Sequence, residues 1–163
     1  MLSSKLFSLL TFAAAAVARI PTGQFFITNI ETEKVLQAGN GSSGPDAFIV
    51  VAKRNRRNNA QIWSHTKGSR ILRNEASQLV LEVPRTNGAV EYGTKLQEGE
   101  PRDEANDDLT QLWDYDEDAQ HLFTLADTNA CLTAEGSAQY AIVDFCDTQD
   151  NDSQRWELVS VRD

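Results

Sequence analysis

The sequence predicts an all-β protein built from one short unit that occurs three times. A Gln-x-Trp triplet recurs at Gln61–Trp63, Gln111–Trp113 and Gln154–Trp156, and these triplets hold all three tryptophans of the chain. The tryptophans stand 50 and 43 residues apart, and recurrence at such a spacing indicates a repeated supersecondary unit. Outside the first 18 residues, no sustained helical stripe of apolar residues is present.

Each third of the chain divides into four short runs rich in Val, Ile, Phe, Leu and Thr, with turn residues between them. The expected strands are 24–29, 34–38, 47–52 and 61–66; 70–74, 78–83, 93–97 and 111–115; and 121–125, 130–134, 141–146 and 154–159. Twelve short strands in three fourfold units predict a β-trefoil, a closed six-stranded barrel capped by three hairpins. Closure removes the exposed sheet edges that short strands otherwise present.

The triplets have a structural interpretation. One Trp from each repeat, Trp63, Trp113 and Trp156, can cover the apolar area where the barrel meets its cap. The amides of Gln61, Gln111 and Gln154 can bond the backbone of a neighbouring turn. The repeats are expected at about 20–66, 67–117 and 118–163.

The first 18 residues have the pattern of a secretory signal peptide. A positively charged start containing Lys5 is followed by the apolar run 6–17, and Ala16–Ala18 is a small-x-small cleavage site. About 12 apolar residues are too few for a membrane span, which needs roughly 20. We therefore expect a secreted, extracellular protein whose single folded domain covers 19–163.

Two cysteines and two sequons also fit a secreted protein. Cys131 and Cys146 are 15 residues apart, and two such cysteines in an oxidising compartment usually form a disulfide. Asn40 and Asn151 each begin an Asn-x-Ser sequon in a turn-like segment, which predicts N-glycosylation and a glycoprotein.

The formal net charge of −9 argues against nucleic acid or anionic membranes as partners. The charge is uneven: residues 97–118 hold ten acids and one base, Arg102, whereas Lys53–Arg57 is strongly basic. Both segments are typical of solvated loops. The basic segment has two further interpretations, an anion contact or a dibasic processing site.

In these features the sequence resembles the ricin-B-type lectins, which are β-trefoils that carry a Gln-x-Trp triplet in each repeat. The third repeat carries the resemblance best: 130–134 is similar to the family's Cys-x-Asp-x strand, and Cys146 lies eight residues before Gln154. The segment Ile20–Ile30 also resembles the opening strand of small secreted fungal members.

The resemblance implies a sugar site in each repeat, made of an Asp on the second strand, an aromatic ending the third strand and an Asn before the Gln. No repeat keeps the full set, so a degenerate or altered site is expected. The carbohydrate-binding candidates on or near these positions are Gln37, Glu82, Thr133, Asp144 and Asn151. Other surfaces offer stacking rings at Tyr92, Tyr115, Tyr140 and Phe145, although each of these also suits partly buried packing.

Other motifs are interpreted as turns. Gly39–Gly44 matches a dinucleotide pattern, but Pro45 and a β run follow it instead of a helix. Asp147–Asp152 has oxygen ligands at calcium-like spacing but lacks the Gly and the closing Glu. No catalytic residue, cofactor or metal is expected, and the protein is predicted not to be an enzyme.

Three functions remain open. The first is a non-catalytic lectin-like module that binds a glycan or glycoprotein. The second is a β-trefoil protease inhibitor whose Lys53–Arg57 loop or 97–110 loop enters a protease cleft. The third is a secreted effector that uses the trefoil as a scaffold for a protein partner.

Overall fold

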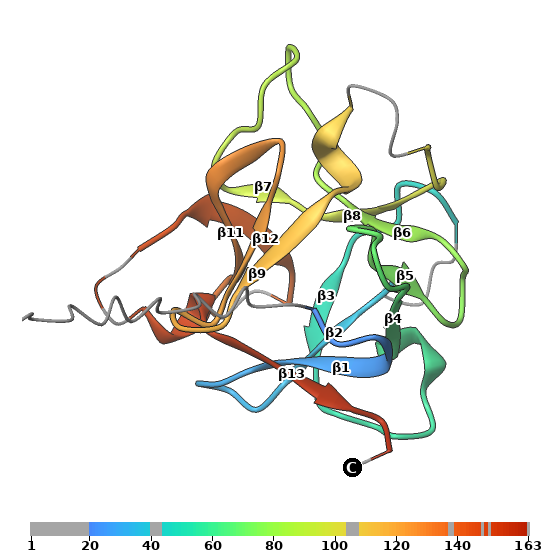
Figure 1. The fold of residues 1–163 in the computed structure, drawn as a ribbon. Coiled ribbons are helices and arrows are strands. Elements are labelled where there is room, and N and C mark those ends of the chain that lie inside the picture. Colours follow the sequence, from blue (N-terminus) through green and yellow to red (C-terminus); the bar gives the residue numbers. More distant parts are fainter. Residues whose placement is uncertain are drawn as a thin grey trace, which may run out of the picture.

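The computed structural model describes residues 20–39, 44–103, 108–136, 139–147, 149 and 151–162. Within these residues the chain is all-β and contains no α-helix (Figure 1). The strands are β1 (Gly23–Asn29), β2 (Val35–Gln37), β3 (Val50–Ala52), β4 (Trp63–His65), β5 (Arg73–Asn74), β6 (Val80–Glu82), β7 (Thr94–Lys95), β8 (Gln97–Gly99), β9 (Trp113–Asp116), β10 (His121–Thr124), β11 (Asp127–Ala134), β12 (Ala141–Phe145) and β13 (Trp156–Ser160). Three short 3-10 turns are η1 (Asn59–Gln61), η2 (Leu109–Gln111) and η3 (Asp152–Gln154).

Six strands close into a barrel. β13 pairs with β1, β1 with β4, β4 with β5, and β9 with β10, all antiparallel. Two hydrogen bonds complete the ring: Trp113 N donates to Arg70 O at 2.8 Å, and Trp156 N donates to Gln120 O at 2.8 Å. The barrel therefore has no free edge, as the sequence predicts for short strands.

The cap consists of three hairpins, β2–β3, β6–β8 and β11–β12. One residue from each repeat joins them in a cycle: Ile49 N donates to Leu96 O at 2.9 Å, Leu96 N to Ala141 O at 2.9 Å, and Ala141 N to Ile49 O at 3.0 Å. All three residues are fully buried. This cycle marks the pseudo-threefold axis and confirms the β-trefoil.

The observed strands differ from the predicted runs by up to three residues at their ends, and two of the differences have an identifiable cause. The run 93–97 divides into β7 and β8, because the main chain of Leu96 bonds to the other two hairpins. The Gln of each triplet ends a 3-10 turn, so the last strand of each repeat begins at the Trp. A polar side chain starts each turn by accepting a hydrogen bond from the main-chain N–H two residues later; these side chains are Asn58, Asp108 and Asn151.

The three tryptophans lie at the centre of the core. Each is 0 % exposed and packs in one apolar cluster with the inward residues of barrel and cap. Each indole N–H donates to a second-strand carbonyl of its own repeat: Trp63 to Leu36 O at 3.1 Å, Trp113 to Leu81 O at 3.0 Å and Trp156 to Leu132 O at 2.8 Å. A buried indole N–H usually finds such a partner, and here the bond ties barrel to cap.

The predicted disulfide is confirmed. Cys131 on β11 and Cys146 just after β12 are bonded, with their Cα atoms 5.0 Å apart. The bond crosses the open end of the third hairpin. In the described part of the chain, no helix is long and apolar enough to cross a bilayer.

Candidate functional site

The amide of each triplet Gln holds the loop that follows the third strand of its repeat. In the first repeat, Gln61 Nε2 donates to Lys53 O at 2.9 Å and Gln61 Oε1 accepts from Asn55 N at 2.7 Å. The same pair of bonds recurs at Gln111 with Glu100 O and Arg102 N, and at Gln154 with Phe145 O and Asp147 N. The triplet Gln is thus a structural residue in all three repeats.

The same amide also bonds the second-strand residue at which the lectin resemblance places a sugar acceptor. These bonds are Gln61 Nε2 to Gln37 Oε1 at 2.9 Å, Gln111 Nε2 to Glu82 Oε2 at 2.8 Å, and Gln154 Nε2 to Thr133 Oγ1 at 3.1 Å. Gln37, Glu82 and Thr133 are therefore equivalent positions, and each has a partner within the protein.

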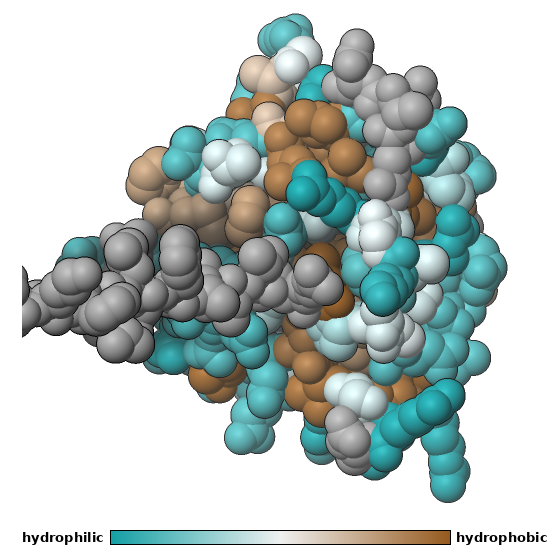
Figure 2. Space-filling model, viewed as in Figure 1, coloured by the Kyte–Doolittle hydropathy of each residue, from teal (hydrophilic) through white to brown (hydrophobic). Residues whose placement is uncertain are grey.

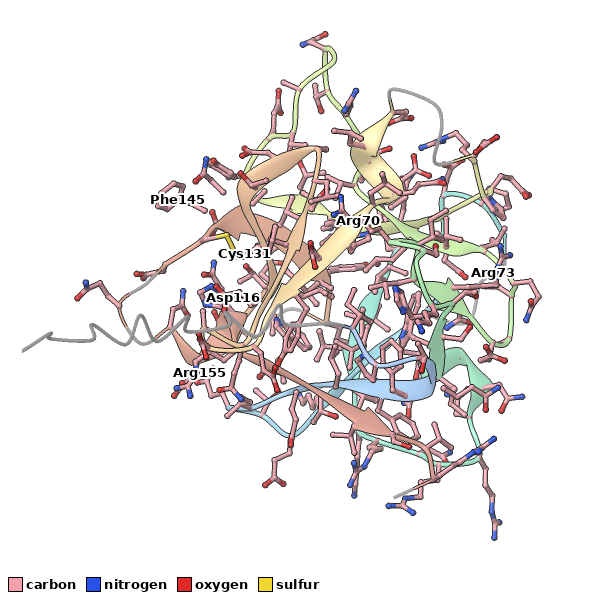
Figure 3. The ribbon with its side chains drawn as sticks, in the orientation of Figure 1. Arg70, Arg73, Asp116, Cys131, Phe145 and Arg155 are labelled. Atoms are coloured by element: carbon pink, nitrogen blue, oxygen red, sulfur yellow. A yellow bond between two sulfur atoms is a disulfide. The ribbon has the colours of Figure 1, made fainter. Side chains whose placement is uncertain are left out.

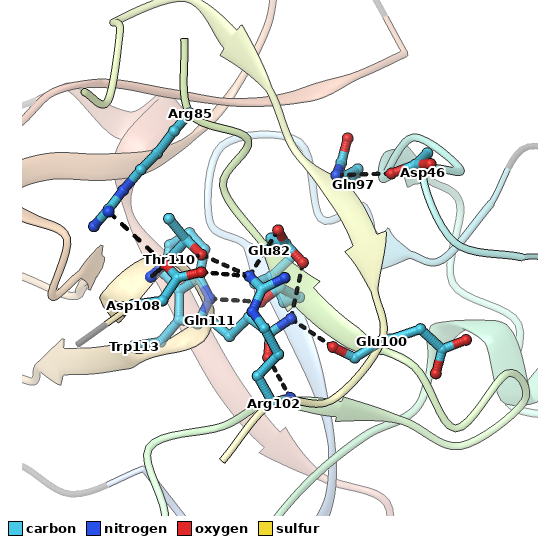
Figure 4. Close-up of polar contacts among 11 residues, drawn as sticks. Asp46, Glu82, Arg85, Gln97, Glu100, Arg102, Asp108, Thr110, Gln111 and Trp113 are labelled. Atoms are coloured by element: carbon cyan, nitrogen blue, oxygen red, sulfur yellow. Dashed lines mark hydrogen bonds and ion pairs between the residues drawn. The ribbon is translucent and has the colours of Figure 1, made fainter. Parts of the chain in front are cut away.

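In the second repeat, the acceptor carboxylate is closed off by an arginine (Figure 4). Arg102 Nη2 donates to Glu82 Oε1 at 2.9 Å, so both oxygens of Glu82 are bonded. The same guanidinium bonds Thr110 Oγ1 at 2.9 Å and pairs with Asp108 Oδ2 at 3.1 Å. The Glu82 side chain is only 12 % exposed, and a sugar hydroxyl would have to displace Arg102 to reach it.

Charge balance supports this closed arrangement. Arg85 Nη1 lies 4.0 Å from Asp108 Oδ1 on the other side of the cluster. Burial acts to raise the pKa of Asp108, but hydrogen bonds from Thr110 and the charges of Arg102 and Arg85 lower it overall. Two guanidinium groups thus face two carboxylates, and the cluster is satisfied without a ligand.

The acceptor positions of the other two repeats are uncharged and also bonded. Gln37 Oε1 accepts a second amide bond, from Asn58 Nδ2 at 3.2 Å, and Gln37 Nε2 donates to Gly39 O at 3.2 Å. Thr133 is buried, and its hydroxyl donates to Cys131 O at 3.1 Å. Neither position presents a free carboxylate to solvent.

The remaining candidates, Asp144 and Asn151, lie in the same repeat as Thr133, and Asp144 pairs in register with Cys131, two residues from Thr133 on β11. Asp144 on β12 accepts from Phe145 N at 2.8 Å, and Asn151 caps η3 by accepting from Ser153 N at 3.3 Å and Ser153 Oγ at 2.6 Å. No hydrogen bond among the described residues joins Asp144 or Asn151 to Thr133. Asn40, the other predicted glycosylation site, falls outside the part of the chain that the structure describes.

A family model for the ricin-type beta-trefoil lectin domain matches residues 23–156. The chain belongs to this family. Carbohydrate binding is therefore the function that its fold and family suggest. A comparison with curated protein sequences found no significant match.

Solved structures share the fold of this ricin-type domain at low sequence identity. The mdaA-1 domain has a TM-score of 0.75 and 22% identity, with 88% of this chain and 93% of that chain covered. The designed threefold-symmetric protein ThreeFoil has a TM-score of 0.66 and 19% identity, covering 84% and 98%. The C-half of an earthworm R-type lectin, solved in complex with GalNAc, has a TM-score of 0.62 and 17% identity, covering 86% and 99%.

Exposed aromatic rings lie elsewhere on the lectin domain. The face in Figure 2 shows apolar groups in separate patches among hydrophilic residues. Of the predicted stacking rings, Tyr115 is a packing residue: its hydroxyl donates to Trp156 O at 2.8 Å, and burial together with nearby carboxylates raises its pKa to about 12. Lys95 Nζ lies 3.9 Å from the ring centre of half-buried Tyr140. Tyr92 and Phe145 are 48 % and 57 % exposed.

One cavity of about 670 Å³ lies between the start of the domain and the loops around β4 and β9. Its polar lining includes His65, Lys67, Arg70 and Asp114, and buried Trp113 also lines it. None of the predicted sugar-binding residues lines this cavity. The described residues contain no group of three or more His, Cys, Asp or Glu placed to hold a metal ion.

Proposed function

We propose that this protein is a secreted, non-catalytic carbohydrate-binding module whose sugar site departs from the family's pattern. Family membership supports carbohydrate binding, and a GalNAc complex is known for the earthworm lectin of the same fold. The matching family model describes a lectin domain and no catalytic one, which supports a non-catalytic role. The signal-like segment 1–18 and the Cys131–Cys146 disulfide support secretion.

One observation supports the altered site: the three acceptor positions are all bonded within the protein. Glu82 is the sole carboxylate among them, and Arg102 and Gln111 bond both of its oxygens. A binding site selects its ligand poorly when some of its polar groups are missing or are already hydrogen-bonded within the protein. The sugar is therefore expected to bind away from Gln37, Glu82 and Thr133.

Thermal unfolding with free saccharides tests this proposal. A ligand that binds only the folded state at 100 times its Kd stabilises the protein by about 2.7 kcal/mol. For a domain near 150 residues this corresponds to a rise in Tm of roughly 5–10 °C. We expect such a rise with at least one saccharide of a broad panel, and the same rise with Glu82→Ala and Thr133→Ala.

The three outcomes are distinct. A saccharide shift that one of these two variants abolishes, while its own fold persists, would place a family-type site in that repeat and contradict the altered site. No shift with any saccharide would contradict carbohydrate binding itself. A shift retained in both variants supports the proposal.

A second candidate, protease inhibition, rests on the basic segment Lys53–Arg57. All five of its residues are exposed, and Gln61 anchors the segment through Lys53 O and Asn55 N. An exposed loop with a fixed backbone is what a protease cleft can receive at low entropic cost. Inhibition of trypsin that Arg56→Ala or Arg57→Ala removes would favour this function; no inhibition by the wild-type protein would exclude it for trypsin.

A further inference from the structure

Two exposed aromatic rings from different repeats meet on the surface. Phe145 ends β12 in the third repeat, and Tyr92 precedes β7 in the second. Their ring centres are 5.8 Å apart with an interplanar angle of 76°, an edge-to-face geometry favoured by aromatic pairs. Figure 3 shows Phe145 projecting from the end of its strand beside the disulfide at Cys131. The exposed rings offer apolar surface on which a ligand can stack.

Both rings are held in place by bonds within the fold. Phe145 O accepts from Gln154 Nε2 at 2.8 Å, and Phe145 pairs in register with Ala130 next to the disulfide. The Tyr92 hydroxyl donates to Asp127 Oδ2 at 3.2 Å. Because the rings are held before any ligand arrives, binding costs little conformational entropy.

The Asp127 carboxylate lies beside the rings. Asp127 accepts the Tyr92 hydroxyl and also Asn129 N at 3.0 Å, which fixes its orientation and leaves lone pairs for a ligand. Desolvation and the neighbouring Asp127 carboxylate, to which the Tyr92 hydroxyl donates, raise the pKa of Tyr92. A site with aromatic rings and an anionic acceptor suits a ligand that has an apolar face and hydroxyl donors and carries no negative charge.

The pair of Tyr92 and Phe145 includes none of the family's acceptor positions, and it differs from a second aromatic pair at the surface. Phe48 and Tyr140 also meet edge to face, at 5.6 Å. Lys95 Nζ, however, lies 3.9 Å from the Tyr140 ring centre and 5.4 Å from that of Phe48. A cation therefore already occupies that pair, whereas the Phe145 pair has no such cation among the described residues.

We propose that Phe145 and Tyr92 form a stacking site for an uncharged pyranose, whose C–H face lies on the rings and one of whose hydroxyl groups donates to Asp127. This inference rests on the proposed carbohydrate-binding function and gives that function a location and a ligand class. The negative charge of Asp127 disfavours sialylated, uronic and sulfated sugars.

The test is titration calorimetry of the wild-type protein with galactose, N-acetylgalactosamine, N-acetylglucosamine, lactose and 6'-sialyllactose. The variants are Phe145→Ala, Asp127→Asn and, as a matched control, Phe48→Ala, which removes a similarly exposed ring. Phe145→Ala keeps the main-chain bonds to Gln154 and Ala130, and its Tm is measured to confirm folding.

We expect at least one uncharged saccharide to bind, with affinity lowered about tenfold or more by Phe145→Ala, lowered by Asp127→Asn and unchanged by Phe48→Ala. Lactose should bind more tightly than 6'-sialyllactose. If uncharged saccharides bind and Phe145→Ala keeps full affinity, this location is wrong and the proposed function stands. If 6'-sialyllactose alone binds, the ligand class is wrong. If no saccharide binds, the location and the function both fail.

Discussion

Gly99 is the residue at which the closed cluster of the second repeat can be tested most sharply. It ends β8 directly against the Glu82 carboxylate. A Cβ added at Gly99 would lie 1.7 Å from Glu82 Oε2, 2.8 Å from Glu82 Cδ and 2.9 Å from Gln111 Nε2. Gly99 is not among the glycines with positive φ, so its backbone accepts alanine and the cost of Gly99→Ala comes from this clash.

The magnitude follows from the bonds that the carboxylate must give up. To clear the new methyl group, Glu82 Oε2 must leave Gln111 Nε2, its partner at 2.8 Å. A hydrogen bond to a charged group contributes about 1.5–3 kcal/mol, and the Arg102 bond is strained at the same time. We expect Gly99→Ala to lower the free energy of unfolding by about 2 kcal/mol, or Tm by roughly 4–8 °C.

The assay is urea unfolding of four proteins: wild type, Gly99→Ala, Glu82→Ala and the double variant. If the clash is the cause, Gly99→Ala costs much less once Glu82 is absent, with a coupling energy of about 1–2 kcal/mol. An equal cost in both backgrounds would place the damage in the backbone. A neutral Gly99→Ala would show that the carboxylate is not held where the structure places it.

Three further predictions concern stability. Replacing both Cys131 and Cys146 by Ala should lower the free energy of unfolding by about 3 kcal/mol, because the bond closes a loop of about 15 residues; reductant should then have no further effect on urea unfolding. Trp63→Phe should cost about 1–3 kcal/mol by leaving Leu36 O without its indole donor, again measured in urea. Burial lowers the pKa of His121 below 6.5, so the folded state binds fewer protons and stability falls as pH drops through that value; in paired thermal melts, His121→Gln should reduce this fall between about pH 5 and 7.

The fold could be predicted from the sequence because its signals are local and repeated. The triplet Trp residues mark the core of each repeat, and short apolar runs mark the strands. The predicted start of the last strand was wrong by two residues in each repeat, because the capped 3-10 turns η1, η2 and η3 extend to the triplet Gln. The division at Leu96 depends on bonds to two distant hairpins, which no local pattern contains.

The site could be predicted only in part. The equivalence of Gln37, Glu82 and Thr133 follows from their place on the second strand of each repeat, but their hydrogen-bond partners within the protein do not. Arg102 closes Glu82 across 20 residues of sequence. The sequence did contain a signal for this ion pair. Arg102 is the one base among ten acids in 97–118, and such a base is well placed to pair with a carboxylate.

The exposure of Phe145 could not be predicted from the sequence, because a short apolar run does not show which residue at its end faces solvent. The sequence offered four aromatic residues as stacking rings without ranking them. The tertiary structure separates them: Tyr115 bonds Trp156 O and Tyr140 lies against Lys95, whereas Tyr92 and Phe145 form an exposed pair.

The most direct test of carbohydrate binding through an altered site is a glycan array probed with the secreted protein, whose all-β fold is first verified by circular dichroism. The wild-type protein should bind a set of uncharged glycans, and Glu82→Ala should bind the same set with equal strength. A blank array from the folded protein, or a set that Glu82→Ala no longer binds, would contradict the account.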